Sequence, residues 1–172
     1  MKKQKVTPIL FDTFLAVIKN STGSKIFRNF YAEVNGKKTD ITENGSLSCA
    51  WFVSSLLYLF KLIKDAHATV NGTIKDLKQS GWEKISVKGE SVSGRKKPKI
   101  GSVLVWEKID FGNNNFHKHI GFYLGNGKAI STSSKNGEPL IHHWTFGTKR
   151  NNPVRKVEAT FWNKKLNQLR IK

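Results

Sequence analysis

One apolar stretch constrains the fold of this chain more than any other. Residues 50–63, AWFVSSLLYLFKLI, carry apolar side chains on every side of a helical wheel, a pattern typical of a buried helix. The preceding segment ENGSLS is predicted to be a loop in which Ser46 and Ser48 can cap the helix. The sequence therefore predicts a central helix with Cys49, the single cysteine, in its first turn.

Helices are predicted in the first half of the chain and strands in the second. Apolar spacing over residues 8–19 and 70–79 favours two amphipathic helices, the second closed by Gly81. Residues 29–41 read as a hairpin that turns at Asn35-Gly36, with a helix as the competing interpretation. Residues 111–118 read as a loop, and β-rich segments are expected at 101–109, 119–134, 138–146 and 154–162. This order predicts an α+β fold with an antiparallel sheet.

The length of 172 residues favours one domain with its own hydrophobic core. No run of eighteen apolar residues occurs, so no transmembrane helix is expected. The N-terminus has a basic start and an apolar middle, but Pro8 and Asp12 interrupt it. We therefore interpret it as a helix of the mature protein rather than a signal peptide.

The charge balance predicts an attraction to polyanions. Thirty Lys and Arg residues against twelve Asp and Glu give a net charge of +18, which suits nucleic acid, anionic lipid or anionic cell-wall polymers. The basic segments 94–99 and 147–156 read as solvated loops. The sequence contains no recognised nucleic-acid motif and no Gly-rich phosphate loop.

Cys49 can be interpreted in two ways from its position. A single cysteine excludes an intramolecular disulfide and a Cys-rich zinc site, and a free cysteine is commonly a small buried apolar residue. At a helix N-terminus, however, backbone N–H groups and the helix dipole favour the reactive thiolate. A packed cysteine and a nucleophile are both consistent with this position.

A nucleophile needs a base, and histidine is the usual one. His117 and His119 would share one face of a strand if that strand begins early enough, whereas His142 and His143 would face opposite sides of the sheet. No carboxylate-rich or Cys-rich segment accompanies them, so no metal is expected.

Three segments resemble the NlpC-like cell-wall cysteine peptidases and the related CHAP amidases. HIGFYLGNGKAI, residues 119–130, resembles their His motif, in which the base precedes a Gly, an aromatic residue and a Gly-Asn-Gly turn. Residues 47–60, LSCAWFVSSLLYLF, resemble their nucleophile helix. Residues 98–108, PKIGSVLVWEK, resemble the strand that precedes the His. The resemblance covers about residues 45–146, and its Cys-then-His order argues against the circularly permuted acyltransferase branch.

The resemblance implies a papain-like fold in which the Cys helix packs on a C-terminal antiparallel sheet. Residues 1–44 would be an N-terminal extension and residues 45–172 the catalytic core. Cys49 would be the nucleophile and His119 the base. Ser131 or Thr132 stands at the position of the orienting residue, for which His142 competes, and no cofactor is implied.

The implied reaction is cleavage of an amide bond in peptidoglycan, within the stem peptide or between peptide and sugar. Family members often line the cleft with an aromatic residue, for which Trp51 and Tyr31 are candidates. Ser48 and His117, which neighbour the proposed pair, complete the predicted substrate-binding set. Such an enzyme would work in the cell envelope or after secretion by a route the sequence does not reveal, with the cytoplasm as the alternative.

Three departures from the family pattern keep other functions open, and one of them is the orienting position, where the family commonly has His, Asn or Gln and this sequence has Ser131 or Thr132. Ser48-Cys49-Ala50 stands where the family often has Asp-Cys-Ser, and Gly101-Ser102 stands where Gly-Asp is common. One alternative is a cationic protein that binds nucleic acid or wall polymer and merely packs its cysteine. The other is a papain-like acyltransferase or deconjugating enzyme.

Overall fold

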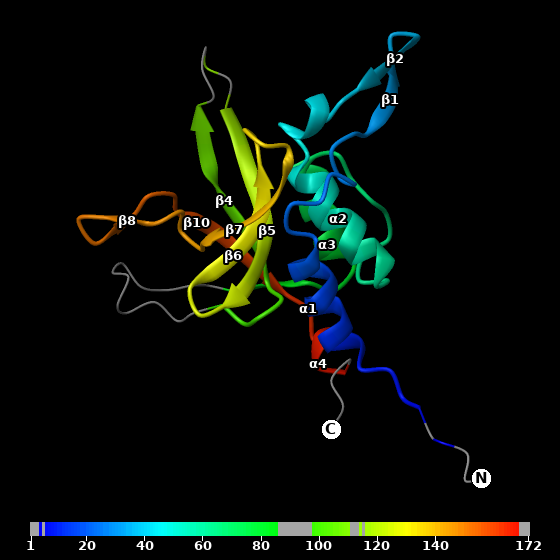
Figure 1. Ribbon diagram of the computed structural model, residues 1–172, viewed down its shortest axis with the longest axis vertical. Helices are drawn as coiled ribbons and strands as arrows, with labels where there is room; N and C mark the ends of the chain where they lie inside the picture. Colours follow the sequence, from blue (N-terminus) through cyan, green and yellow to red (C-terminus); the bar gives the residue numbers. More distant parts are fainter. Residues whose placement is uncertain (1–3, 5, 86–97, 111–113, 115, 169–172) are drawn as a thin grey trace.

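The computed structural model describes residues 4, 6–85, 98–110, 114 and 116–168 (Figure 1). The α-helices are α1 (Leu10–Asn20), α2 (Cys49–Leu59), α3 (Val70–Gln79) and α4 (Lys165–Gln168), with a short 3₁₀ helix at Glu43–Gly45. The strands are β1 (Tyr31–Val34), β2 (Lys37–Asp40), β3 (Glu83–Ile85), β4 (Val103–Asp110), β5 (Phe116–Gly125), β6 (Lys128–Ser133), β7 (Glu138–His143), β8 (Thr148–Lys149), β9 (Asn152–Pro153) and β10 (Val157–Trp162).

Six strands form one antiparallel sheet in the order β3-β10-β4-β5-β6-β7. The helices α1, α2 and α3 lie on one side of this sheet, and β1 and β2 project from the helical layer as a separate hairpin (Figure 1). The α+β class predicted from the sequence is confirmed. Asn35 and Gly36 both have positive φ angles, which gives the β1–β2 turn that the sequence predicted.

The main core fills the space between the helices and the sheet. Phe52 and Leu57 of α2 are fully buried and belong to one cluster with Ile120, Phe122 and Ile130 of the sheet. The expected helix end at residue 63 is wrong, because α2 ends at Leu59. Residues 60–63 turn away through the left-handed backbone of Lys61, while Leu62 and Ile63 stay buried.

The first 44 residues contribute to the same core. Phe14 and Ile18 of α1 are fully buried in the main cluster. The Phe14 ring meets the edges of Phe60 and Phe122, with ring centroids 5.2 and 5.8 Å apart. Phe27, in the following loop, packs against Phe52 in the same way. These residues therefore help to bury the helix that carries Cys49.

A smaller cluster lies on the other face of the sheet. It contains Leu104, Trp106, Tyr123, Ala129 and Trp144. The Trp106 indole Nε1 donates a hydrogen bond of 2.8 Å to the Trp144 carbonyl. The sheet is thus packed on both faces around the middle of β5.

Several element boundaries differ from those the sequence predicted. β5 begins at Phe116, inside the expected loop, because residues 116–120 pair with β4. The strand β10 begins at Val157 rather than residue 154. The strand β3 and the helix α4 were not predicted, and residues 94–97 of the first basic segment lie outside the described residues. Within the described part of the chain, no helix combines the length and apolarity that crossing a membrane requires.

Candidate active site

Cys49 is the first residue of α2, and the loop before it is held in place by close backbone packing. Gly45 has a φ of +96°, and a Cβ added there would lie 2.6 Å from the Cα of Gly137. Only glycine fits this approach between the loop and the β6–β7 turn. The Ser48 hydroxyl donates to the Gly45 carbonyl at 2.9 Å instead of capping the helix. The start of α2 is thereby fixed against the sheet.

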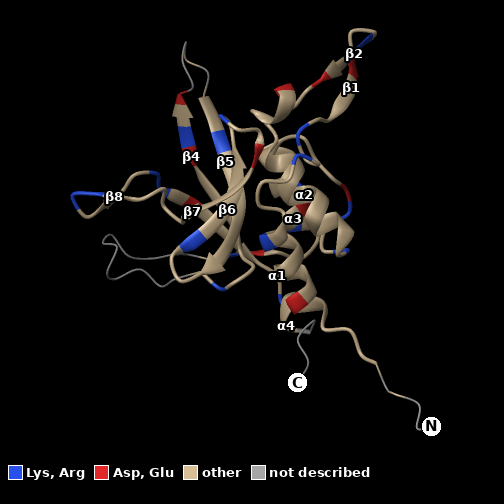
Figure 2. Ribbon diagram, in the orientation of Figure 1, with Lys and Arg blue, Asp and Glu red and all other residues tan. Residues whose placement is uncertain are grey.

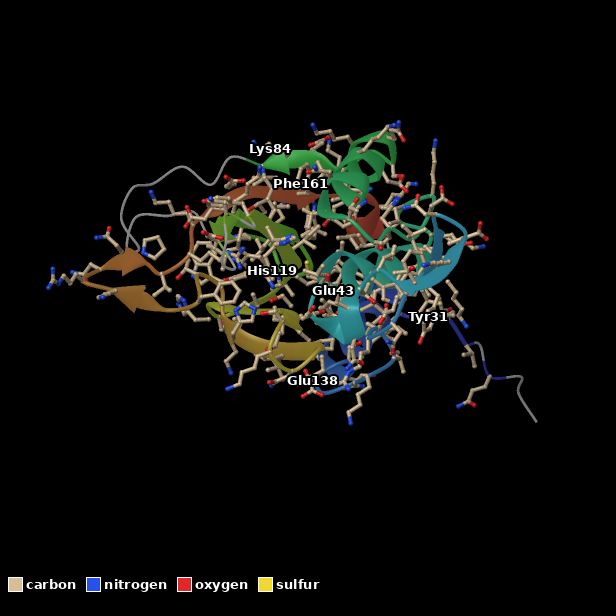
Figure 3. The ribbon with its side chains drawn as sticks, turned by 90° about the horizontal axis from the view of Figure 1, so that it is seen from above. Tyr31, Glu43, Lys84, His119, Glu138 and Phe161 are labelled. Atoms are coloured by element: carbon tan, nitrogen blue, oxygen red, sulfur yellow. The ribbon has the colours of Figure 1, made fainter. Side chains whose placement is uncertain are left out.

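Cys49 and His119 line the same cavity, which has a volume of about 340 Å³. Its walls include residues 46, 47, 49 and 50 around the start of α2, residues 68–71 around the start of α3, and residues 116–119 at the start of β5. Figure 3 shows the two layers from above, with His119 labelled on the sheet and Glu43 labelled in the segment that leads into α2. The fold thus brings the predicted nucleophile and base to one pocket.

The thiol of Cys49 is buried, with 9% of the residue exposed. Burial raises its pKa to about 11, although hydrogen bonds from the backbone of Ile120 and Ala50 and the charge of Arg155 act in the opposite direction. The backbone N–H groups at the helix start lower the pKa, as the sequence position predicted, but burial outweighs them. The cost of moving a thiolate out of water exceeds the stabilisation by the helix end.

A chain of hydrogen bonds holds the imidazole of His119. Its Nε2 lies 2.8 Å from the Ser131 hydroxyl oxygen, which lies 2.7 Å from Nε2 of His142. The Nδ1 of His142 lies 2.8 Å from the carbonyl oxygen of His143. We call this chain of groups, from His119 through Ser131 and His142 to the His143 carbonyl, the imidazole relay.

The His143 carbonyl sets the direction of the whole relay. A carbonyl only accepts, so Nδ1 of His142 carries the proton, and burial lowers the pKa of His142, which favours the ring with an unprotonated Nε2. Its Nε2 must then accept from Ser131, and the Ser131 oxygen accepts from Nε2–H of His119. The relay therefore leaves Nδ1 of His119 with a lone pair that can accept a proton.

Burial also favours the neutral form of His119. It lowers the pKa of His119 to about 3, and the charges of Arg155 and His142 act in the same direction. Among the described residues, no hydrogen bond joins the His119 ring to Cys49. Both shifts favour a neutral thiol and a neutral imidazole.

Gly121, the glycine of the His-Ile-Gly sequence, is needed because β5 and β6 pack closely there. A Cβ on Gly121 would lie 2.8 Å from the Cβ of Ser131 and 3.1 Å from the indole of Trp106. The glycine therefore lets β6 approach β5 closely enough for Ser131 to reach the His119 ring.

The structure separates the other predicted residues. Ser131 contacts the imidazole, whereas the buried Thr132 hydroxyl has no partner among the described residues. His117 lines the Cys49 cavity. The other predicted substrate-binding residues, Ser48, Trp51 and Tyr31, are not among the residues that line it. Trp51 stacks on Phe30 with ring centroids 4.6 Å apart, and Tyr31 is exposed on β1 beneath the ammonium of Lys38.

Two residues near His119 were not identified from the sequence. Arg155 is only 6% exposed, so the expectation of a solvated loop is wrong at this residue. Its guanidinium donates hydrogen bonds to the carbonyls of Glu107 and His117. Phe146 stacks on His142, with ring centroids 4.1 Å apart and an interplanar angle of 22°. Nothing in a run of basic residues distinguishes a buried arginine from its exposed neighbours.

Within the described residues, no group of three or more His, Cys, Asp or Glu side chains is arranged to hold a metal ion. No known family model and no curated protein matches this sequence.

Proposed function

We propose that this protein is a papain-like cysteine hydrolase that cleaves an amide bond in peptidoglycan. The observation that supports the proposal is that Cys49 and His119 both line one cavity, while the hydrogen bonds of the imidazole relay leave Nδ1 of His119 as an acceptor. The sequence resemblance to cell-wall cysteine peptidases supplies the substrate class. The elements α2 and β5 supply the nucleophile and the base.

The neutral pair that burial favours determines the proposed mechanism. When an amide carbonyl enters the cavity, Nδ1 of His119 takes the thiol proton as Sγ of Cys49 attacks the carbonyl carbon. The backbone N–H groups at the start of α2 stabilise the oxyanion. The imidazolium then gives its proton to the leaving amine. In the second half, His119 takes a proton from water, the resulting hydroxide attacks the thioester, and the acid leaves as Cys49 recovers its proton.

The surface charge supports a site of action on an anionic polymer. Lys and Arg are spread over the described strands, loops and hairpin tips rather than gathered in a single stripe (Figure 2). With a net charge of +18, such a surface attracts the protein to a polyanion by non-specific electrostatic attraction. This pattern suits an enzyme that stays on an envelope while it encounters its substrate.

Release of amino groups from purified sacculi tests the proposal. The wild-type protein is expected to release new amino groups, and Cys49→Ala and His119→Ala are expected to lose this activity. Tyr58→Phe, at an exposed position on the same helix, is the matched control and should retain it. Equal release by Cys49→Ala would refute the thiol mechanism. Salt-dependent polyanion binding without any amine release would instead favour the binding-protein alternative.

A further inference from the structure

A second cavity, of about 510 Å³, lies next to the imidazole relay. His119, Ser131, His142 and Arg155 line part of it. The rest of its wall combines the apolar side chains of Ile109, Leu140, Phe146 and Val154 with the hydroxyl residues Thr132, Ser133 and Ser134. We call it the Arg155 cavity. No acidic side chain is among the described residues that line it.

Arg155 is buried, and no carboxylate lies within ion-pair distance of it in the described part of the chain, although the charge of Glu107 acts on it and its guanidinium lies over the Phe146 ring at 5.6 Å. Its three hydrogen bonds use Nε and Nη2 and end on the carbonyls of Glu107 and His117. A guanidinium has five N–H donors, and the two on Nη1 have no partner among the described residues. A buried charge is costly unless it is paired. The guanidinium is therefore prepared to receive an anion.

The proposed reaction gives a second reason for an anion at this place. Proton transfer from Cys49 makes His119 an imidazolium, and the nearby charge of Arg155 disfavours that form. An anion bound to Arg155 would offset this repulsion. Binding in the Arg155 cavity would thus make His119 a stronger base only when a suitable ligand is present.

We infer that the Arg155 cavity binds a carboxylate attached to a small apolar body, and that the enzyme cleaves amides lying close to such a carboxylate. The planar guanidinium matches the two oxygens of a carboxylate, and the apolar part of the wall suits an alkyl body better than a fully solvated phosphate. The second half of the inference rests on the proposed function, whereas the first half does not.

Hexanoate is a probe of this chemistry that requires no catalysis. Calorimetric titration into the full-length Cys49→Ala protein, at about 0.15 M ionic strength to screen surface charge, is expected to give saturable binding at one site. Hexanamide has the same shape without the charge and should bind at least tenfold more weakly. N-acetylalanine in a parallel titration separates two sources of the carboxylate. Tighter binding of N-acetylalanine identifies a peptide carboxy-terminus, and tighter binding of hexanoate a simple fatty acid.

Three variants locate the binding. Arg155→Lys keeps the charge but removes the planar fork, and should weaken hexanoate at least tenfold. Val154→Trp starts from a side chain that is 58% exposed, so it can fill the cavity without disturbing the core and should abolish binding. Arg150→Gln removes one charge from an exposed turn of the same segment and should leave the hexanoate Kd unchanged.

Several outcomes would overturn the inference. One is equal binding of hexanamide and hexanoate, and another is tighter binding of inorganic phosphate than of hexanoate. A third is an unchanged Kd for hexanoate in Val154→Trp. This third result decides the question if Arg155→Lys does not fold. The two proposals can fail separately. Amine release from sacculi without hexanoate binding would remove only this inference, whereas hexanoate binding without amine release would remove only the hydrolase.

Discussion

At the residue scale, burial raises the pKa of Cys49 and lowers that of His119, and both shifts favour a neutral pair. The sequence singles out both residues as candidates, because a cysteine beside an apolar helix and a histidine close to a Gly-containing turn are local patterns. It does not give their pKa values. Those depend on how much water the fold removes around each group, which is a property of the assembled layers.

The raised pKa of Cys49 predicts a slow reaction with iodoacetamide at neutral pH. Because the thiolate is the reactive form, the labelling rate should continue to rise beyond pH 9, where an ordinary thiol with a pKa of about 8.5 approaches its plateau. Mass spectrometry of the labelled protein measures the rate, with glutathione as the exposed-thiol control. A plateau below pH 8 would show that the thiol is instead stabilised as a thiolate.

At the scale of elements, β5 and β6 together position His119, the proposed base. Replacing Ser131 with Ala breaks the imidazole relay, so His119 is no longer held as the Nε2–H form and kcat should fall more than tenfold with little change in KM. Thr132→Val, at the neighbouring position, keeps the shape of the threonine side chain and should lower kcat less than Ser131→Ala does. The ¹⁵N shifts of the His119 ring give a readout independent of activity. They should show protonated Nε2 in the wild type and mixed tautomers in Ser131→Ala, and an unchanged spectrum would contradict the role of Ser131.

Elements with a clear period or turn signal could be predicted, and those decided by distant contacts could not. The apolar pattern of α2 and the glycines of the β5–β6 turn are visible in a few consecutive residues. The strand β3 and the helix α4 are too short to show a period. Arg155 is buried because it donates to the carbonyl of Glu107, 48 residues earlier in the chain, and no local pattern reveals such a contact. Ser131 was one of several candidates until its distance to His119 was known.

At the scale of the whole molecule, the first helix is part of what holds the candidate site together. Phe14→Ala should lower the free energy of unfolding by about 3–5 kcal/mol, as is usual when a buried phenylalanine is removed. Leu10→Ala changes a residue on the same helix that is 43% exposed and should have a much smaller effect. Urea denaturation monitored by circular dichroism measures both. Equal effects would mean that α1 is an appendage to the core.

The outer strand β7 has a consequence for how the molecule behaves at high concentration. The Trp144 amide pairs inward with Gly127, so residues 139, 141 and 143 direct their backbone groups outward. Pro139 lacks an N–H and its carbonyl already accepts from Gly23, while the His143 carbonyl accepts from Phe146 and from the His142 ring. Outside these bonds, this strand keeps the outward amide and carbonyl of Ile141 and the outward amide of His143, so this margin of the sheet offers only a short template on which a second chain could add a strand and aggregate.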